Sequence, residues 1–392
     1  MAVRNNVSSL STAERDRLVK GVKLLKAAPS RFTPPTAGRY DDYVYVHMQA
    51  MLVMEIEDRA KPVRNGNWKL ISDMRMPMWA HRCPAFLPWH REFLHQIELD
   101  LQAVLRDPNI GIPYWDWSVD HSRSKLPWTT DLLGGDGRDG PVQSGPFAGK
   151  TNWELTLSED GVDHLVRGFG LDHQAGARLP SKAEEQATLQ IAKYDASPWS
   201  DNAALATFRN QLEGWHVPAG SPMPVGMHNR VHVWVGGTKG TMLPSTSPND
   251  PAFFLHHCNI DRLWAVWQRS HPAGPLYLPA RPLPGEPGQS LNEPMIFYDT
   301  TLSTTPPWTD PPATPIGMLD HHKLRYTYDT DPPVHDIEGG IMATTELSRQ
   351  PARIQELATD PLKRKAFRIA PRDRFRKRLE QLEQVSPAGP SS

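Results

Sequence analysis

Two pairs of histidines have spacings that could bring imidazoles to a metal ion. His228 and His232 stand four residues apart in a stretch of helical periodicity, so both rings lie on one helix face, about 40° apart around the axis. This i, i+4 spacing occurs in many unrelated metal sites. His81 and His90 are nine residues apart, the first on an expected loop and the second inside a helix that opens at Leu87. These two rings converge on one ion only if the loop folds back.

A third candidate lies in the segment 250–264, where His256 and His257 are adjacent. Neighbouring residues on a helix point about 100° apart, which argues against one ion taking both rings. The face that carries His257 also carries Phe254, Asp261 and Trp264. We therefore assign His257 as the ligand and His256 as a packed neighbour that can support it. A single histidine in an apolar stripe is more often a core residue than a ligand, but that explanation would have to hold for several histidines at once.

Helices must position these histidines, and apolar residues at helical spacing predict where they lie. The expected helices span residues 11–26, 40–59, 87–105, 228–235 and 251–269, with a shorter one at 183–193. Ser11 and Glu14 predict a capping box at the start of the first helix. Glycine and proline punctuate residues 107–204, which predicts a long irregular crossover, and residues 324–330 have the pattern of a short strand.

Composition excludes several classes of protein. The 392 residues carry 43 Lys and Arg against 44 Asp and Glu, a balance that disfavours binding to nucleic acid or to an acidic membrane surface. The N-terminus lacks the apolar region of a secretory signal, so we expect a cytoplasmic protein unless a partner carries it out. Two cysteines cannot form a disulfide framework, and we expect Cys83 and Cys258 to be small buried residues.

The stretches from His81 to Glu98 and from Asp250 to Asp261 resemble the two copper-binding signatures of the family of tyrosinases, catechol oxidases and hemocyanins. The resemblance extends to residues 113–117 and to the Tyr-x-Tyr segment 326–328, so it covers roughly residues 40–329. It implies a mainly α fold, with a four-helix-bundle core that holds a dinuclear copper site, long Pro/Gly-rich loops and a few short strands. We expect a catalytic domain over residues 1–330 and a charged tail, partly helical or disordered, over residues 331–392.

The same resemblance implies two copper ions and dioxygen as the co-substrate. All-imidazole ligation suits copper that cycles between Cu(I) and Cu(II). His47 is matched by its Tyr-x-x-Val-His setting, and its distance of 34 residues from the next ligand implies an insertion around residues 61–78. The implied ligands are, for one ion, His47, His81 and His90 and, for the other, His228, His232 and His257.

The implied reaction is copper-dependent oxidation of phenols by dioxygen, namely ortho-hydroxylation of monophenols and oxidation of o-diphenols or o-aminophenols to o-quinones or quinone imines. In the family, a glutamate and an asparagine hold the water that takes the phenol proton, and Glu213 and Asn229 match them. The alternatives are a structural carboxylate for Glu213 and helix capping or backbone bonding for Asn229. Some relatives join a cysteine to the second histidine, but Cys83 follows His81 instead of preceding it, so we expect no thioether.

Two other classes of function are alternatives. A hemocyanin-like protein would bind oxygen reversibly without turnover, but no aromatic residue closes the segment 236–244, which we expect to line the mouth of the site. A zinc hydrolase is disfavoured because Asn229 stands where such enzymes carry a glutamate. The expected partner is a small phenolic substrate, with neither nucleic acid nor membrane, and a helper protein that delivers copper is a further possibility.

Overall fold

The computed structural model describes residues 1–33, 35–59, 79–135, 140–158, 161–170, 178–219, 226–297 and 312–332. Up to Asp331 these residues belong to one compact unit. The predicted insertion at 61–78 lies outside the described residues, and so does the predicted tail from residue 333 onward. None of the described helices is long and apolar enough to cross a membrane.

The predicted long helices are confirmed to within one residue at each end. They are α1 (Thr12–Ala27), α2 (Arg39–Arg59), α3 (Phe86–Leu105), α7 (Met227–Gly236) and α8 (Ala252–Ser270). The capping box at the start of α1 is present, with the Ser11 side chain accepting from the Glu14 backbone N–H and the Glu14 carboxylate accepting in return.

Two shorter helices differ from the sequence prediction. The structure ends α5 (Lys182–Leu189) four residues before Lys193, where the chain tightens as the Ile191 N–H bonds the Thr188 carbonyl three residues back at 3.2 Å. The carbonyl of Lys193 accepts a hydrogen bond from the backbone N–H of Phe208 at 2.9 Å. That bond helps to start α6 (Phe208–Glu213), a buried helix that we did not predict. Six residues are too few to show a helical repeat in the sequence. Helix α4 (Gly149–Asn152) is a single turn, and within the described residues there are also four 3₁₀ turns, at Val7–Ser9, Ser247–Asn249, Pro315–Met318 and His321–Leu324.

Strands are few and short in the described residues, as expected. The strand predicted within 324–330 is β4 (Tyr326–Tyr328), and it pairs in parallel with β1 (Ala2–Arg4), which we did not predict. A second small sheet pairs β2 (Gly140–Pro141) with β3 (Val166–Arg167) in antiparallel fashion. The extreme N-terminus is therefore part of the core unit, although the family resemblance begins only near residue 40.

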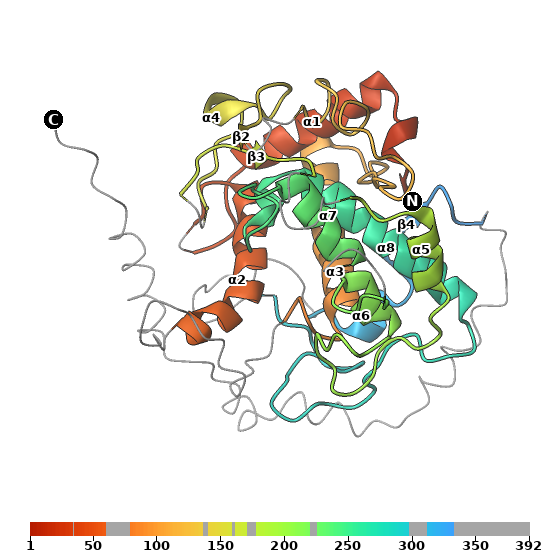
Figure 1. Ribbon diagram of the computed structural model, residues 1–392. Helices are drawn as coiled ribbons and strands as arrows, with labels where there is room; N and C mark the ends of the chain where they lie inside the picture. The colour runs from red at the N-terminus through yellow and green to blue at the C-terminus, as the bar shows by residue number, and fades with distance from the viewer. Residues whose placement is uncertain are drawn as a thin grey trace. The chain divides into compact units, whose positions relative to one another are not determined.

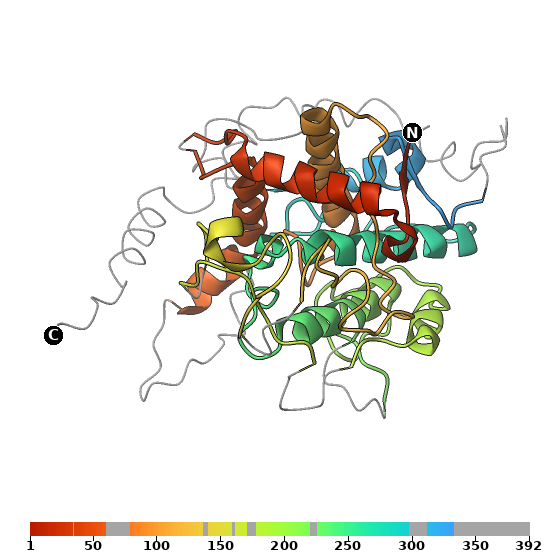
Figure 2. The same cartoon turned by 90° about the horizontal axis from the view of Figure 1, so that it is seen from above.

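Helices α3, α7 and α8 lie in the middle of the compact unit, with α8 packed against both of the others. Helix α2 lies to one side, and α1 packs across α2 and α3 (Figures 1 and 2). Aromatic rings fill the space between α2, α3 and α8: the Phe93 ring stacks on Phe254 at 5.9 Å and meets Tyr43 edge-on at 5.6 Å. This packing brings the predicted histidines of three helices to one region.

A buried charge network fixes α3 against α8. Arg91 of α3 donates to the Asp261 carboxylate of α8 at 2.5 Å, and the same carboxylate accepts from the hydroxyls of Tyr326 and Tyr328 at 2.6 and 2.5 Å. Arg4 of β1 adds a second guanidinium at 3.1 Å. Each buried charge has an opposite charge beside it, so removing one partner would leave the others uncompensated.

Candidate metal centre

Three histidines from α2, α3 and the loop between them form the first cluster: His47, His81 and His90. All three are buried, and the Nε2 atoms of His47 and His81 are 3.1 Å apart. His47 Nδ1 lies 2.6 Å from the carbonyl oxygen of Ser245, and His90 Nδ1 lies 2.8 Å from that of Phe86. A carbonyl can only accept, so each Nδ1 carries the hydrogen and each Nε2 keeps its lone pair for a metal ion.

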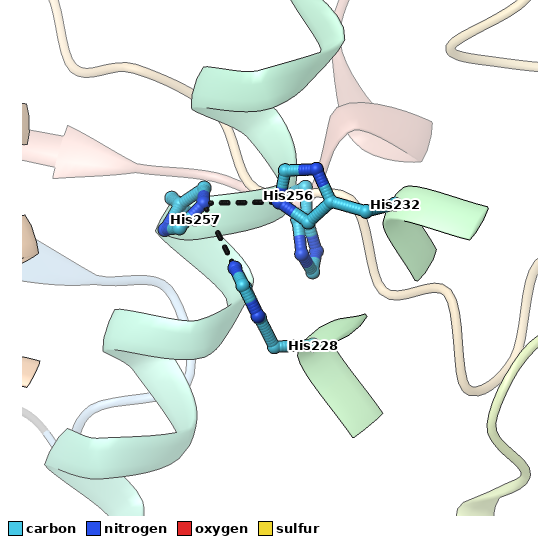
Figure 3. A group of neighbouring side chains, drawn as sticks. All are labelled: His228, His232, His256 and His257. Atoms are coloured by element: carbon cyan, nitrogen blue, oxygen red, sulfur yellow. Dashed lines mark hydrogen bonds between the residues drawn. The ribbon is translucent and has the colours of Figure 1, made fainter. Parts of the chain in front are cut away.

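The second cluster combines α7 and α8 and contains His228, His232, His256 and His257. Figure 3 shows His228 and His232 reaching from α7 toward α8, where dashed lines join both of them to His257. The His257 Nε2 is 3.2 Å from that of His228 and 3.4 Å from that of His232. His232 Nδ1 lies 2.6 Å from the carbonyl oxygen of Met242, which again directs its Nε2 inward.

His256 is oriented differently from its neighbour. Its Nδ1 accepts a hydrogen bond from the Trp117 indole N–H at 3.1 Å, and its ring stacks on His228 at 5.1 Å between centroids. The sequence argument for His257 as the inward ring and His256 as a packed support agrees with this arrangement. Trp117 lies in the Pro-Tyr-Trp-Asp-Trp segment, whose contact with the cluster we did not foresee.

The two clusters adjoin each other. The His90 ring stacks on His257 with centroids 4.3 Å apart, and His81 lies 5.6 Å from His228. Two phenylalanines close the sides: Phe86 lies 5.0 Å from the His228 ring, and Phe253 stacks on His257 at 4.0 Å. The arrangement is therefore one continuous group of imidazoles walled by aromatic rings.

The donor set and its geometry fit two transition-metal ions. Nitrogens about 2.0–2.1 Å from one ion lie roughly 3.2–3.5 Å apart at near-tetrahedral angles, and the Nε2 separations within the clusters are 3.1, 3.2 and 3.4 Å. Burial lowers the pKa of His47, His90, His228 and His257 well below the ordinary value and that of His232 to about 4. Imidazoles held neutral in this way are in the form that binds metal.

Glu213 is fully buried at the end of α6 and contacts both clusters. Its Oε2 accepts from Arg209 Nη1 at 3.0 Å, and its Oε1 accepts from the Arg82 backbone N–H at 2.6 Å. Burial by itself would raise the pKa of Glu213, but His81, 3.7 Å away, and the Arg209 guanidinium outweigh it and hold the pKa below its ordinary value. The backbone carbonyl of Glu213 lies 3.2 Å from His228 Nδ1. One residue thus reaches a histidine of each cluster.

Asn229 lies beside the residue that follows Glu213. Its Oδ1 is 2.9 Å from His228 Nδ1, while its Nδ2 is buried with no hydrogen-bond partner among the described residues. Gly214, at φ 108°, allows this approach, because an added Cβ would lie 3.1 Å from the Asn229 Cβ and 2.5 Å from the Gly226 carbonyl oxygen. Gly226 is the N-cap of α7, and no side chain caps that helix. Among the described residues the Asn229 side chain therefore neither caps α7 nor bonds to the backbone, which were the two alternatives for it.

The segment 236–244 was expected to line the mouth of the site. Its end, together with the next residue, also orients histidine rings. The carbonyls of Met242 and Ser245 each orient one histidine, one in either cluster. On α7, Asn229, His232 and Val233 are partly exposed, whereas the other histidines of the two clusters are buried. His232 is therefore the partly exposed histidine of the two clusters. Sequence motifs do not reveal such backbone carbonyl partners, because any residue type supplies one.

Cys83 and Cys258 are both free and buried, which confirms that they are small core residues. Cys83 follows Arg82, whose backbone adopts a left-handed conformation with φ 55°. The Arg82 guanidinium lies over the Trp215 ring at 4.4 Å. The turn that carries His81 is thereby attached to the segment that carries Glu213.

A helical protein with two adjoining clusters of histidines whose ring nitrogens converge belongs to the class of histidine-ligated metalloproteins. Residues 37–270 match the family model described as the common central domain of tyrosinase. The chain belongs to the tyrosinase family, whose metal is copper. The resemblance first noted in the two histidine signatures is thus confirmed.

Similar proteins support the same family. The chain is 41% identical over 333 residues to a tyrosinase of Streptomyces antibioticus, and the matched region covers 84% of this chain and 100% of that protein. It is 35% identical over 349 residues to the grixazone synthase of Streptomyces griseus, with 83% and 99% coverage. Among solved structures, a mutant polyphenol oxidase from Thermothelomyces thermophila matches with a TM-score of 0.51 and 25% identity over 73% of each chain. The mainly α fold is therefore confirmed.

Proposed function

We propose that this chain oxidises phenols with dioxygen at two copper ions, one held by His47, His81 and His90 and the other by His228, His232 and His257. The substrates are monophenols, which are hydroxylated at the ortho position, and o-diphenols or o-aminophenols, which are oxidised to o-quinones or quinone imines. The observation that carries this proposal is the stacking of His90 on His257 at 4.3 Å, because it places the two ligand sets side by side. Two-metal sites with ions about 3.5–4 Å apart act jointly on one substrate.

Bound copper supplies cycling between Cu(I) and Cu(II) and open coordination positions. The chain supplies the surroundings. Backbone carbonyls at Ser245, Phe86 and Met242 hold three rings in the tautomer that leaves Nε2 for the metal. The rings of Phe86 and Phe253 exclude water from the sides, so charge interactions inside the site are strengthened.

A phenol enters along the exposed face of α7. A phenolic hydroxyl has an ordinary pKa near ~10, so a monophenol needs a base before it can bind as phenolate. The buried Nδ2 of Asn229 has a hydrogen to donate. The ionised Glu213 directly precedes Gly214, the glycine that lies against Asn229. We assign to Asn229 and Glu213 a shared water that accepts the phenol proton, with Asn229 Nδ2 donating to the water oxygen.

Oxygen uptake tests the proposal. The copper-loaded chain should consume oxygen with tyrosine, with catechol and with 2-aminophenol; a chelator that removes copper should abolish uptake, and added copper should restore it. Metal analysis should find two copper ions per chain. Absence of uptake with all three substrates, in protein that contains both ions, would contradict the enzyme and favour reversible oxygen binding. The similar tyrosinases and grixazone synthase favour the oxidase over the carrier. A copper-delivery helper and a cytoplasmic location stay predictions.

A further inference from the structure

A third group of potential metal ligands lies outside the copper centre. It consists of His321 and His322, which begin the 3₁₀ turn His321–Leu324, and Asp331, which follows β4. One donor atom of each residue lies within 4.8 Å of the others. None of these residues belongs to the two histidine clusters described above. The proposed oxidation of phenols leaves this group without a task.

The two imidazoles face the same carboxylate oxygen. His321 Nε2 is 2.8 Å and His322 Nε2 is 3.8 Å from Asp331 Oδ2, and the ring centroids are 4.1 Å apart. His322 Nε2 is buried and has no hydrogen-bond partner among the described residues, although 37% of its side chain is exposed. A buried ring nitrogen that points at a carboxylate beyond hydrogen-bonding distance leaves space that an ion can fill.

The carboxylate is held in place by donors that do not block the imidazoles. Asp331 Oδ2 accepts from the Tyr328 backbone N–H at 2.8 Å and from the Thr327 hydroxyl at 2.9 Å. Its Oδ1 pairs with Arg269. Hydrogen-bonded carboxylates of this kind are common around metal ligands because they fix the ligand's direction. The Arg269 charge offsets part of the carboxylate charge, so we expect moderate affinity, with Kd in the micromolar range.

We propose that His321, His322 and Asp331 bind one divalent transition-metal ion, for which Zn²⁺ is the natural probe. Two imidazoles and a carboxylate match the ligand preference of zinc and disfavour calcium or magnesium, which take oxygen ligands. With bonds of about 2.0–2.1 Å, the nitrogen–oxygen separations correspond to angles of roughly 85° and 135° at the ion. Burial lowers the pKa of His321 despite the nearby carboxylate, so the ring is neutral at neutral pH. Its Nε2 donates to Asp331 Oδ2 at 2.8 Å, and metal binding would displace that hydrogen to Nδ1. The exposed side of His322 leaves a position for water.

The ion would join two parts of the chain. His321 and His322 stand just before β4, and Asp331 stands just after it, at the last residue of the compact unit. Strand β4 in turn pairs with β1 and carries Tyr326 and Tyr328, whose hydroxyls reach Asp261. Metal binding here would therefore stabilise the end of the core without touching the copper ligands.

Zinc titration into the full-length chain, loaded with only two equivalents of copper so that the six-histidine centre takes the copper, tests this proposal. Calorimetry at neutral pH should find one equivalent of zinc beyond the copper ions, and His322→Ala should weaken its binding at least tenfold. His164→Ala is the matched control, because His164 is a partly exposed histidine beside a single carboxylate, with its Nδ1 2.8 Å from Asp163. This control should bind zinc as the unmodified chain does.

Three results would overturn the site: no zinc bound beyond the copper ions, equal zinc affinity in His322→Ala and the unmodified chain, or an equal loss in the His164→Ala control. Oxygen uptake with catechol, measured on the same samples, should be the same in all three proteins. Failure of the zinc site would leave the phenol oxidase proposal intact, because the two depend on different residues and different readouts.

Discussion

Replacing Glu213 by glutamine separates the two roles that its contacts allow. Glutamine keeps the size of the side chain and one carbonyl oxygen. That oxygen can still accept from the Arg82 backbone N–H, which lies 2.6 Å from Glu213 Oε1 in the structure. It removes the negative charge that faces Arg209 Nη1 at 3.0 Å and that a shared water would need in order to pass on a proton. A structural carboxylate would lose stability only, whereas a proton-accepting carboxylate would also lose one particular reaction.

The stability loss follows from the contacts. A hydrogen bond to a charged group contributes about 1.5–3 kcal/mol, and removing one partner of a buried ion pair costs about 3–5 kcal/mol. Arg209 keeps a second carboxylate, since its Nε donates to Asp195 Oδ2 at 2.8 Å. We therefore expect Glu213→Gln to lower the free energy of unfolding by about 2–3 kcal/mol at neutral pH.

The pH dependence has a definite sign. The pKa of Glu213 in the folded chain lies below the ordinary value of 4.5. Its carboxylate therefore stabilises the fold fully above pH 4.5, and this contribution is lost as the pH falls through the folded pKa. Glu213→Gln lacks the contribution at every pH. Urea unfolding at several pH values should show that the stability difference between the two proteins narrows below about pH 4.5.

The activity assay compares two substrates. Oxygen uptake with tyrosine should fall about 10²-fold or more in Glu213→Gln, the usual effect of losing a positioned base, while uptake with catechol should change by less than about threefold. Asp195→Asn is the control, because Asp195 also pairs with Arg209 but contacts neither histidine cluster in any described hydrogen bond. It should lose stability without changing the ratio of the two activities. An unchanged ratio in Glu213→Gln, or the same fall in Asp195→Asn, would refute the base and leave a structural carboxylate.

Two further substitutions test the neighbours of Glu213. In thermal unfolding, Gly214→Ala should destabilise the fold by about 1–3 kcal/mol more than Gly161→Ala. Both glycines have positive φ, but of the two only Gly214 would place a Cβ 2.5 Å from a carbonyl oxygen. Equal losses would count against that contact. Asn229→Ala should lower the ratio of tyrosine to catechol oxidation about tenfold or more, because the water loses a donor. Copper content should be kept, because the Glu213 carbonyl still accepts from His228. A normal ratio would show that Asn229 holds no water.

The helices that carry histidines were predictable because their apolar stripes are long. Each of α2, α3 and α8 spans five turns or so, which is enough for a helical repeat to stand out. The choice of His257 over His256 rested on helix geometry, since residues about 100° apart are poorly placed to bind one ion together. In the structure, His257 lies toward His228 and His232, and His256 turns to Trp117.

The partners that orient the rings were not predictable, for a physical reason. His47 and His232 donate to backbone carbonyls of one short loop, at Ser245 and Met242, and a carbonyl has no side-chain signature. Arg4 was missed for a different reason: one arginine in a three-residue strand looks like a surface charge. In the structure it is buried and paired with Glu98 at 2.9 Å and Asp261 at 3.1 Å. Only the tertiary fold brings those carboxylates to it.

Glu213 shows why a site of this kind is sensitive to residues that bind no metal. Its carboxylate holds the turn that carries His81, and its backbone carbonyl contacts His228, so a shift of α6 would move a ring in both clusters at once. Nitrogens that share an ion tolerate displacements of only a few tenths of an ångström. A substitution that moved α6 would therefore disturb both histidine clusters together, and with them both of the proposed activities. The isosteric change to glutamine is the one that isolates the charge, so a selective loss of monophenol hydroxylation in Glu213→Gln, without that loss in Asp195→Asn, would assign the proton transfer to the Glu213 carboxylate.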